Sequence, residues 1–356
     1  MISTICISGL IISMVITTLQ LLRRDHWIIR MSDFPHAQLT VMTVVCLVGL
    51  LFFSDLGSPW YIMALEISAG LNLAYQFYII FPYTRLSPKQ VKTIENQNHT
   101  TAISILESNV YMDNDQYDKL IALVYQYQPD ILITLETDQK WQNKLSILES
   151  EYPYSVKCPS DNTYGMHLYS KRKLVNQQVH YLIEQDVPSI EAELLMENQQ
   201  KVRLHILHPK PPSPTQNKTS TPRDAELILI AKQIVNLKLP VIVAGDLNDV
   251  AWSHTNRLFQ RISGLLDPRI GRGFFNTFHA KYPFMRWPLD HIFHSNHFLV
   301  SSIQRLPNIG SDHFPMFIQL QYSPSRAAKK NDSNLSASLE DHQEAKKKLN
   351  KVNIRT

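Results

Sequence analysis

Three long apolar stretches fill the first third of the chain, and they constrain its fold more than any other feature. They are Ile2–Leu22, Ala37–Phe53 and Trp60–Phe81. A helix needs about 20 residues to cross the roughly 30 Å hydrocarbon layer of a bilayer, and each stretch is close to that length. Helices buried in a large soluble core are the alternative, but three such stretches in succession favour membrane spans. The sequence therefore predicts that residues 1–83 form a three-helix transmembrane anchor.

The basic residues beside these stretches predict the orientation of the anchor. Short loops rich in Lys and Arg stay on the cytoplasmic side of a membrane. The connection after the first stretch and the segment after the third both contain such residues, namely Arg23, Arg24, Arg30, Arg85, Lys89 and Lys92. The connection between the second and third stretches contains none. With three spans, both basic segments lie on one side, so the large C-terminal part is expected in the cytoplasm.

The net charge of +4 is concentrated at the C-terminus. Residues 323–356 contain eight Lys or Arg and four Asp or Glu, so this segment alone accounts for the whole net charge. The rest of the chain is neutral, which argues against a wide basic surface that would hold nucleic acid by charge alone. The same segment is rich in Ser, Asn and Lys, which predicts a disordered basic tail in which a short helix could form at Leu339–Leu349.

Between the anchor and the tail the sequence alternates between strand and helix patterns. A polar linker, residues 84–100, precedes residues 101–322, which have the pattern of a folded α/β domain. Several strand-like runs follow one another without a helix between them. This argues against a purely doubly wound sheet and favours a mixed-sheet α/β domain. The strand-like runs lie at 102–110, 130–136, 165–170, 191–196, 201–208, 240–245, 290–295 and 314–322.

The ends of these strands share one kind of chemistry. Six separate strand ends or starts carry an acid, an amide or an imidazole: Asn109, Glu136, His208, Asp246 with Asn248, Asp290, and Asp312 with His313. A single acid after a strand is more often a cap or turn residue than a ligand. Six such ends are hard to explain as turns, so the sequence predicts that these side chains meet in one site.

These residue types suit metal-assisted cleavage of a phosphate ester. Mg²⁺ prefers one or two carboxylates together with water and phosphate oxygens, and Glu136 supported by Asn109 can supply such a site. The reaction also needs an activated water and groups that stabilise transition-state charge, for which an Asp–His pair and amides are suited. The cysteines, Cys6, Cys46 and Cys158, are far apart, so they form neither a disulfide framework nor a zinc-binding pattern.

Six short blocks in fixed order resemble the endonuclease/exonuclease/phosphatase superfamily, the DNase I-like enzymes. The resemblance covers residues 101–322, and the three-span N-terminus is similar to that of bacterial membrane-anchored members. It implies a four-layered α/β sandwich, with two mixed β-sheets flanked by helices, preceded by three transmembrane helices. It also implies dependence on Mg²⁺ or Mn²⁺ and a place in the bacterial inner membrane. The blocks are SNV (108–110), LET (135–137), LHP (207–209), GDLN (245–248), LDHIF (289–293) and SDHFP (311–315).

The resemblance also implies roles for individual residues. Asn109 and Glu136 would hold the metal ion. Asp246 would align or deprotonate the attacking water, and Asn248 would orient that water and the phosphate. His208 would contact the scissile phosphate or protonate the leaving group.

Further residues complete the implied site. Asp290 would support its histidine side, and Asp312 would orient His313. His313 would donate to the phosphate and stabilise the transition state. The Pro-rich loop 209–223 is either a stiff surface loop or a substrate-facing rim, and Arg223, at a predicted helix start, is its best candidate for a phosphate contact.

The leading functional interpretation is a membrane-anchored, metal-dependent phosphoester hydrolase, either a nuclease or other phosphodiesterase or a phosphatase. Its partners would be the lipid bilayer and a phosphate-ester substrate, whether nucleic acid, nucleotide or lipid headgroup, with no obligate protein partner evident. A catalytically inactive membrane scaffold of the same fold is the alternative. Inactive members usually lose an acid of GDLN or SDH, and both motifs are intact here, which favours the enzyme.

Overall fold

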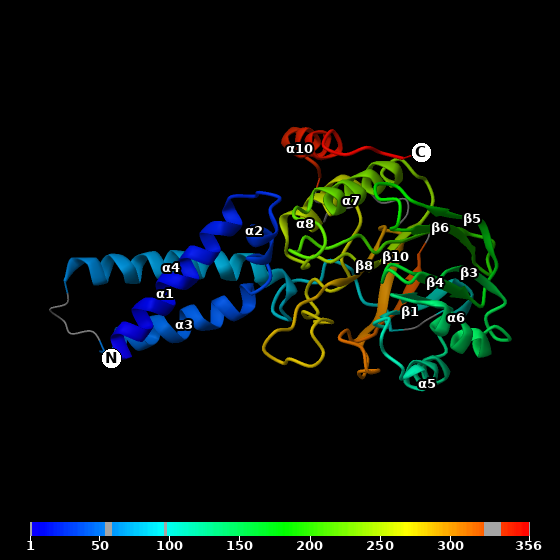
Figure 1. The fold of residues 1–356 in the computed structure, drawn as a ribbon, viewed down its shortest axis with the longest axis horizontal. Coiled ribbons are helices and arrows are strands. Elements are labelled where there is room, and N and C mark those ends of the chain that lie inside the picture. The colour runs from blue at the N-terminus through cyan, green and yellow to red at the C-terminus, as the bar shows by residue number, and fades with distance from the viewer. Residues whose placement is uncertain (1, 54–58, 96–97, 324–335, 356) are drawn as a thin grey trace.

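The computed structural model describes the chain except for residues 1, 54–58, 96–97, 324–335 and 356. Figure 1 shows an elongated molecule, with a bundle of long helices at one end and an α/β domain at the other. The short helix α2 (Trp27–Met31) lies between them, in the connection after the first long helix. The apolar helices and the α/β domain therefore occupy opposite ends of the molecule.

Three helices of the bundle match the apolar stretches of the sequence. Each is long and apolar enough to cross a membrane. Inside the bundle, Gln76 Nε2 donates to Ser13 Oγ at 2.9 Å and to Thr17 Oγ1 at 3.0 Å. Such bonds join the helices and satisfy polar groups that lipid tails could not solvate. The helices are α1 (Ile2–Leu21), α3 (His36–Phe53) and α4 (Trp60–Ile80), and the short 3₁₀ helix η1 (Phe81–Tyr83) continues the last.

Buried contacts fasten the bundle to the α/β domain. Arg30, in α2, is 3% exposed, and its guanidinium lies 3.2 Å from Asp224 and 3.5 Å from Asp25. Burial disfavours its charge, but the carboxylates outweigh burial and raise the pKa of Arg30 above its usual value. Tyr83, just after α4, donates to the carbonyl of Ala251 at 2.7 Å. The first connection thus lies at the domain end of the bundle, as the predicted three-span arrangement requires.

Two mixed β-sheets form the centre of the α/β domain. The first has the strand order β10-β11-β1-β2-β4-β3, and the second has the order β5-β6-β7-β8-β9. The pairs β1–β2 and β7–β8 run parallel, and the other neighbouring strands run antiparallel. The strands are β1 (Ala102–Asn109), β2 (Ile131–Leu135), β3 (Tyr154–Cys158), β4 (Met166–Ser170), β5 (Leu174–His180), β6 (Ser189–Leu195), β7 (Lys201–Ile206), β8 (Val241–Asp246), β9 (Asp290–His294), β10 (Phe298–Arg305) and β11 (Met316–Tyr322).

The two sheets pack face to face, with helices on their outer faces. Strands β2, β4 and β8 are buried at every residue because one face meets the other sheet and the opposite face meets helices. The central core contains Ile105 and Leu168 of the first sheet and Leu204 and Ile292 of the second. The predicted four-layered α/β sandwich is therefore confirmed. Helices α5 (Tyr117–Tyr127) and α6 (Gln139–Leu145) cover the first sheet, and α7 (Thr221–Ile234) and α8 (His254–Ser263) cover the second.

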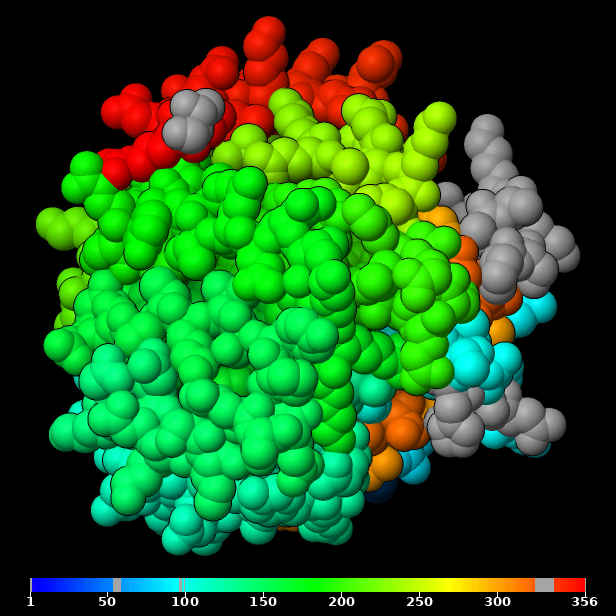
Figure 2. All heavy atoms as spheres, turned by 90° about the vertical axis from the view of Figure 1, so that its right-hand side faces the viewer, coloured from blue at the N-terminus to red at the C-terminus, as the bar shows by residue number. Residues whose placement is uncertain are grey.

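The C-terminal residues contain an ordered helix, α10 (Leu339–Leu349), that begins at a capping box. It lies across α7, as the red segment in Figures 1 and 2 shows. Lys348 Nζ lies 2.7 Å from the buried carboxylate of Asp224, and Arg261 pairs with Asp341 at 2.8 Å. These specific partners hold the helix on the domain.

Two segments outside the predicted α/β domain, the tail and the linker, pack against it. Helix α10 has the bounds of the short helix that the sequence allowed at Leu339–Leu349, although it is packed on the domain and not part of a disordered tail; residues 324–335 lie outside the described part of the chain. Disorder was inferred from composition, which does not reveal buried partners on another element. In the predicted linker, Val91 is fully buried and Thr93 forms a β-bridge with Val300. The linker therefore lies along the domain surface.

Candidate active site

The predicted site residues lie at one edge of the sandwich, where the parallel strands of both sheets end. Strand β1 ends at Asn109 beside the end of β2, and Asp246 at the end of β8 pairs in register with Asp290 at the start of β9. Asn109 Nδ2 donates to Asp246 Oδ2 at 3.2 Å across the two sheets. This hydrogen bond joins residues that the sequence separates by more than a hundred positions, and it defines the centre of the site.

A glycine brings two strand ends together on the second sheet. Gly245 has a φ of +138°, and a Cβ atom there would lie 2.0 Å from the carbonyl oxygen of Leu207. Only glycine allows this close approach without displacing the backbone. As a result His208, the residue after Leu207, lies beside Asp246, with 3.8 Å between His208 Nε2 and Asp246 Oδ2.

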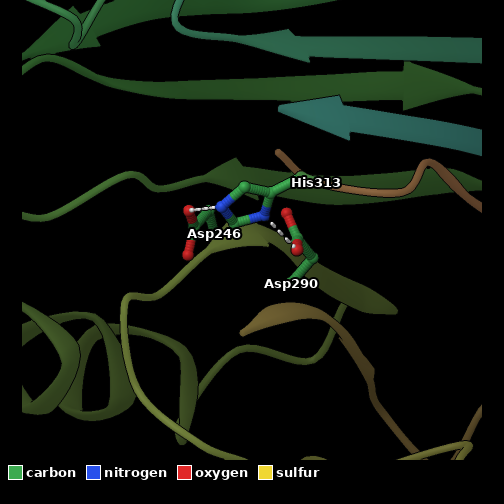
Figure 3. Close-up of side chains that lie close together, drawn as sticks. All are labelled: Asp246, Asp290 and His313. Carbon is green, nitrogen blue, oxygen red and sulfur yellow. Dashed lines mark hydrogen bonds and ion pairs between the residues drawn. The ribbon is translucent and has the colours of Figure 1, made fainter. Parts of the chain in front are cut away.

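Asp246, His313 and Asp290 form a buried cluster at this edge (Figure 3). His313 Nδ1 bonds Asp290 Oδ2 at 2.7 Å, and His313 Nε2 lies 3.6 Å from Asp246 Oδ2. Ser311 Oγ holds the histidine loop in place, because it donates to the carbonyl of Asn109 at 2.8 Å and accepts from the His313 backbone N–H at 3.0 Å. The imidazole is therefore fixed between two carboxylates.

The two carboxylates determine the charge of the imidazole. Burial alone would lower the pKa of His313, but Asp290 and Asp246 outweigh burial and hold that pKa well above its usual value. Burial likewise acts to raise the pKa of Asp290, and the charge of His313 outweighs it and leaves the pKa lowered. The structure thus indicates a His313 imidazolium paired with an Asp290 carboxylate.

Burial shifts the pKa values of Asp246 and His208 toward the neutral form of each group, unlike those of His313 and Asp290. Burial raises the pKa of Asp246 to about 7, although His313 acts to lower it. Burial, helped by the charge of His313, lowers the pKa of His208 to about 3, so its ring is neutral. A carboxyl group with a pKa near neutrality can accept a proton from water, which is what a general base requires.

Asn109 and Glu136 form the other half of the site. Asn109 Nδ2 donates to Glu136 Oε1 at 2.8 Å, and Glu136 has a φ of 60°, a left-handed conformation that non-glycine residues seldom adopt. Burial, with a contribution from Asp312, raises the pKa of Glu136. The Glu136 carboxylate is an oxygen ligand of the kind that Mg²⁺ and Mn²⁺ prefer, so it fits a divalent cation. Asn109 presents its amide N–H to this carboxylate, and its Oδ1 accepts from the Tyr111 backbone N–H at 3.1 Å.

Asp246, Asp290 and His313 are a second set of groups close enough to hold a cation, with their ligand atoms within 4.8 Å of one another. In this set, however, His313 Nδ1 and Asp290 Oδ2 already bond each other. The charged imidazole also repels a cation. The imidazole cluster is therefore a less suitable cation site than the side of Glu136, where the sequence predicts the metal.

Comparison with known proteins agrees with this geometry. A model of the Endonuclease/Exonuclease/phosphatase family matches residues 106–313, more than half of the chain. The chain belongs to this family. No curated protein sequence matches it in a direct search.

Solved structures of the endonuclease/exonuclease/phosphatase family share the fold. The human Nocturnin catalytic domain, with a bound sulfate anion, is 20% identical with a TM-score of 0.52, over 67% of this chain and 99% of that chain. A family protein from Bacteroides thetaiotaomicron is 19% identical with a TM-score of 0.51, over 63% and 98%. D. rerio TDP2, complexed with single strand DNA product, is 18% identical with a TM-score of 0.50, over 62% and 99%.

The structure assigns a different role to Arg223 from the predicted phosphate contact. Arg223 is 1% exposed, and its guanidinium lies 3.0 Å from both Asp224 and Asp249. Arg223 Nη1 also donates to the carbonyl of Asn248. Because these acceptors occupy its donors within the protein, Arg223 supports the GDLN loop and has no exposed donor to offer a phosphate.

The orientation of His313 also differs from the prediction. Asp312 was expected to orient the imidazole, but Asp290 accepts the hydrogen bond of the ring. Asp312 is partly exposed, and its charge acts on Glu136. Adjacent residues such as Asp312 and His313 point in different directions, which a sequence motif does not show. Asn248 lies beside Asp246: its backbone N–H donates to Asp246 Oδ1 at 2.9 Å, and its Nδ2 donates to the carbonyl of Pro209 at 3.0 Å.

The sequence did not lead us to predict one acid beside the site, Glu107. Glu107 is fully buried on β1, two residues before Asn109. Burial, and then the charges of Asp290 and Asp246, raise the pKa of Glu107 well above its usual value. Asp290 Oδ1 is buried and accepts no hydrogen bond from the described residues. A protonated Glu107 carboxyl group can supply the missing donor. The available signal was an acid inside a strand that is otherwise apolar.

Proposed function

We propose that this protein is a membrane-anchored, metal-dependent phosphoester hydrolase that uses an activated water. The observation that supports it most is the meeting of the Asn109–Glu136 pair with the Asp246–His313–Asp290 cluster at one edge of the sandwich. Membership of the family supports the same general activity. The alternative of an inactive scaffold is disfavoured because no acid of either motif is missing.

In this proposal each residue has a defined task. Asp246 accepts a proton from the water that attacks phosphorus, since burial raises its pKa. The His313 imidazolium donates to a phosphoryl oxygen and stabilises the growing negative charge, while Asp290 keeps its ring in place. The neutral ring of His208 lies beside Asp246 and can bond a further phosphate oxygen. A bound divalent cation would polarise the phosphate from the side of Glu136.

Metal removal tests the proposal. EDTA should abolish hydrolysis of bis(p-nitrophenyl) phosphate by the full chain in detergent, and Mg²⁺ or Mn²⁺ should restore it. Glu136→Gln should raise the Mg²⁺ concentration needed for half-maximal activity by at least about tenfold, because a charged oxygen ligand is lost. The exposed Glu149 gives a matched control, Glu149→Gln, which should leave that concentration unchanged. Full activity in EDTA would exclude the metal, and no activity on a broad phosphoester panel would count against the enzyme.

We also propose that the three apolar helices cross the bacterial inner membrane and that the α/β domain is cytoplasmic. The domain-side connection contains the basic residues Arg23 and Arg24, which favour this orientation. Alkaline phosphatase, which is active only outside the cytoplasm, should be inactive when fused after the last residue. A fusion after residue 58, in the second connection, should be active. The reverse pattern would overturn the orientation.

A further inference from the structure

An exposed apolar loop, Lys281–Met285, lies next to the active site. Every residue in it is exposed, and Phe284 is 88% exposed, Tyr282 56% and Met285 52%. A soluble surface seldom displays such a cluster unless the cluster has a binding partner. The loop therefore needs a partner.

This apolar loop is built onto the catalytic residues. At its base Phe278 forms β-bridges with Trp287 and with His313, and the rings of Phe278 and His313 lie 5.0 Å apart. Ala280 N donates to the carbonyl of Asp312 at 2.7 Å, and His279 N closes the loop by donating to the carbonyl of Met285 at 2.9 Å. The loop is thus fixed relative to the site.

The position of the apolar loop points to the bilayer as its partner. Gln38 Nε2 donates to the carbonyl of Phe284 at 2.9 Å, and Gln38 lies in the first turn of α3. At 1.5 Å per residue, the 18 residues of α3 span about 27 Å, close to the thickness of the hydrocarbon layer. The first turn, and Phe284 beside it, would then lie at the membrane surface. Figure 1 shows the loop (yellow) beside the domain end of α3.

The charges near the apolar loop suit a layer of phosphate headgroups. An open pocket of about 530 Å³ lies where α4 leaves the bundle and is lined by Arg85, Arg272 and Arg305. None of these arginines forms a salt bridge within the described residues; Arg272 donates to the carbonyl of Val91 and Arg305 to that of Asn276, so their charges stay uncompensated by a carboxylate. Aromatic and basic side chains together are typical of the boundary between hydrocarbon and headgroups.

We propose that the Lys281–Met285 loop lies in the headgroup layer of the bilayer that holds the anchor, and that the site hydrolyses a phosphate ester carried by a lipid of that bilayer. This inference rests on the proposed hydrolase function. The water oxygen bonds to phosphorus, its proton passes to Asp246, and the leaving ester oxygen departs with a proton from solvent. The loop places the headgroup phosphate beside His313 without removal of the lipid from the membrane.

Photocrosslinking tests the loop without measuring activity. The photoreactive residue p-benzoylphenylalanine replaces Phe284 in the full chain, in vesicles of phosphatidylethanolamine and phosphatidylglycerol. Irradiation should label the protein with lipid. Ile147 is the matched control because it is exposed and follows α6, at the end of the domain remote from the bundle in Figure 1. Equal lipid labelling at both positions, or a product with the mass of two chains at Phe284, would overturn the bilayer contact.

A substrate comparison tests the lipid ester. We expect Phe284→Ser to lower the ratio of vesicle phospholipid hydrolysis to bis(p-nitrophenyl) phosphate hydrolysis by about tenfold. The substitution removes the apolar side chain that would be buried in the bilayer, and with it the free energy of that burial. Ile147→Ser should leave the ratio unchanged. An unchanged ratio for Phe284→Ser, or hydrolysis of the soluble ester alone, would overturn the lipid substrate. Lipid crosslinking without hydrolysis of either ester would refute the proposed function while the bilayer contact stands.

Discussion

Asp246→Asn is expected to lower kcat for phosphoester hydrolysis by about two orders of magnitude or more. Asparagine keeps the size of the side chain and can still accept the hydrogen bond from the Asn248 backbone N–H, so the loop should keep its shape. It cannot accept a proton from water, and it removes the negative charge that faces His313 at 3.6 Å. The loss should therefore appear in kcat at saturating Mg²⁺ and substrate.

The control for this variant is Asp161→Asn, which changes an exposed acid of the same domain in the same way. It should retain the parent rate. Circular dichroism and thermal unfolding in detergent should show that Asp246→Asn is folded. A folded Asp246→Asn protein with a nearly normal kcat would remove Asp246 from the proton-accepting role.

The fold and the members of the site could be predicted because they depend on short-range patterns and motif order. Asn109 and Asp246 end buried strands and Glu136 follows one, and parallel strands end at one edge. Such a pattern predicts which side chains meet. It does not predict their orientation, and for this reason Asp312 was given the hydrogen bond that Asp290 makes.

Other features depend on partners distant in the sequence. Arg223 lies in a segment that suggests an anion-binding helix start, yet its guanidinium is used by Asp224 and Asp249. Lys348 lies in a segment whose composition indicates disorder, yet it reaches the same Asp224 carboxylate. Buried charges of this kind are expensive unless paired, and one sequence does not identify the pairing.

Substitutions in the His313–Asp290 pair are also expected to lower kcat strongly. His313→Gln should lower kcat by about two to three orders of magnitude, because it removes the cation that stabilises transition-state charge. Asp290→Asn should also lower kcat, since the 2.7 Å bond to His313 Nδ1 both orients the ring and maintains its charge. If Asp290 acts only through His313, the double variant should be no slower than His313→Gln alone, to within about threefold.

This cycle separates a positioning role from an independent one. If the fold reductions in kcat of the two single variants multiply in the double variant, Asp290 contributes to catalysis without His313, for example by holding the metal ion with Asp246. In that case the double variant and Asp290→Asn, but not His313→Gln, should also need more Mg²⁺ for half-maximal activity. We expect instead that Asp290→Asn leaves the Mg²⁺ requirement unchanged, because Asp290 Oδ2 faces the imidazole and the proposed metal position is on the side of Glu136.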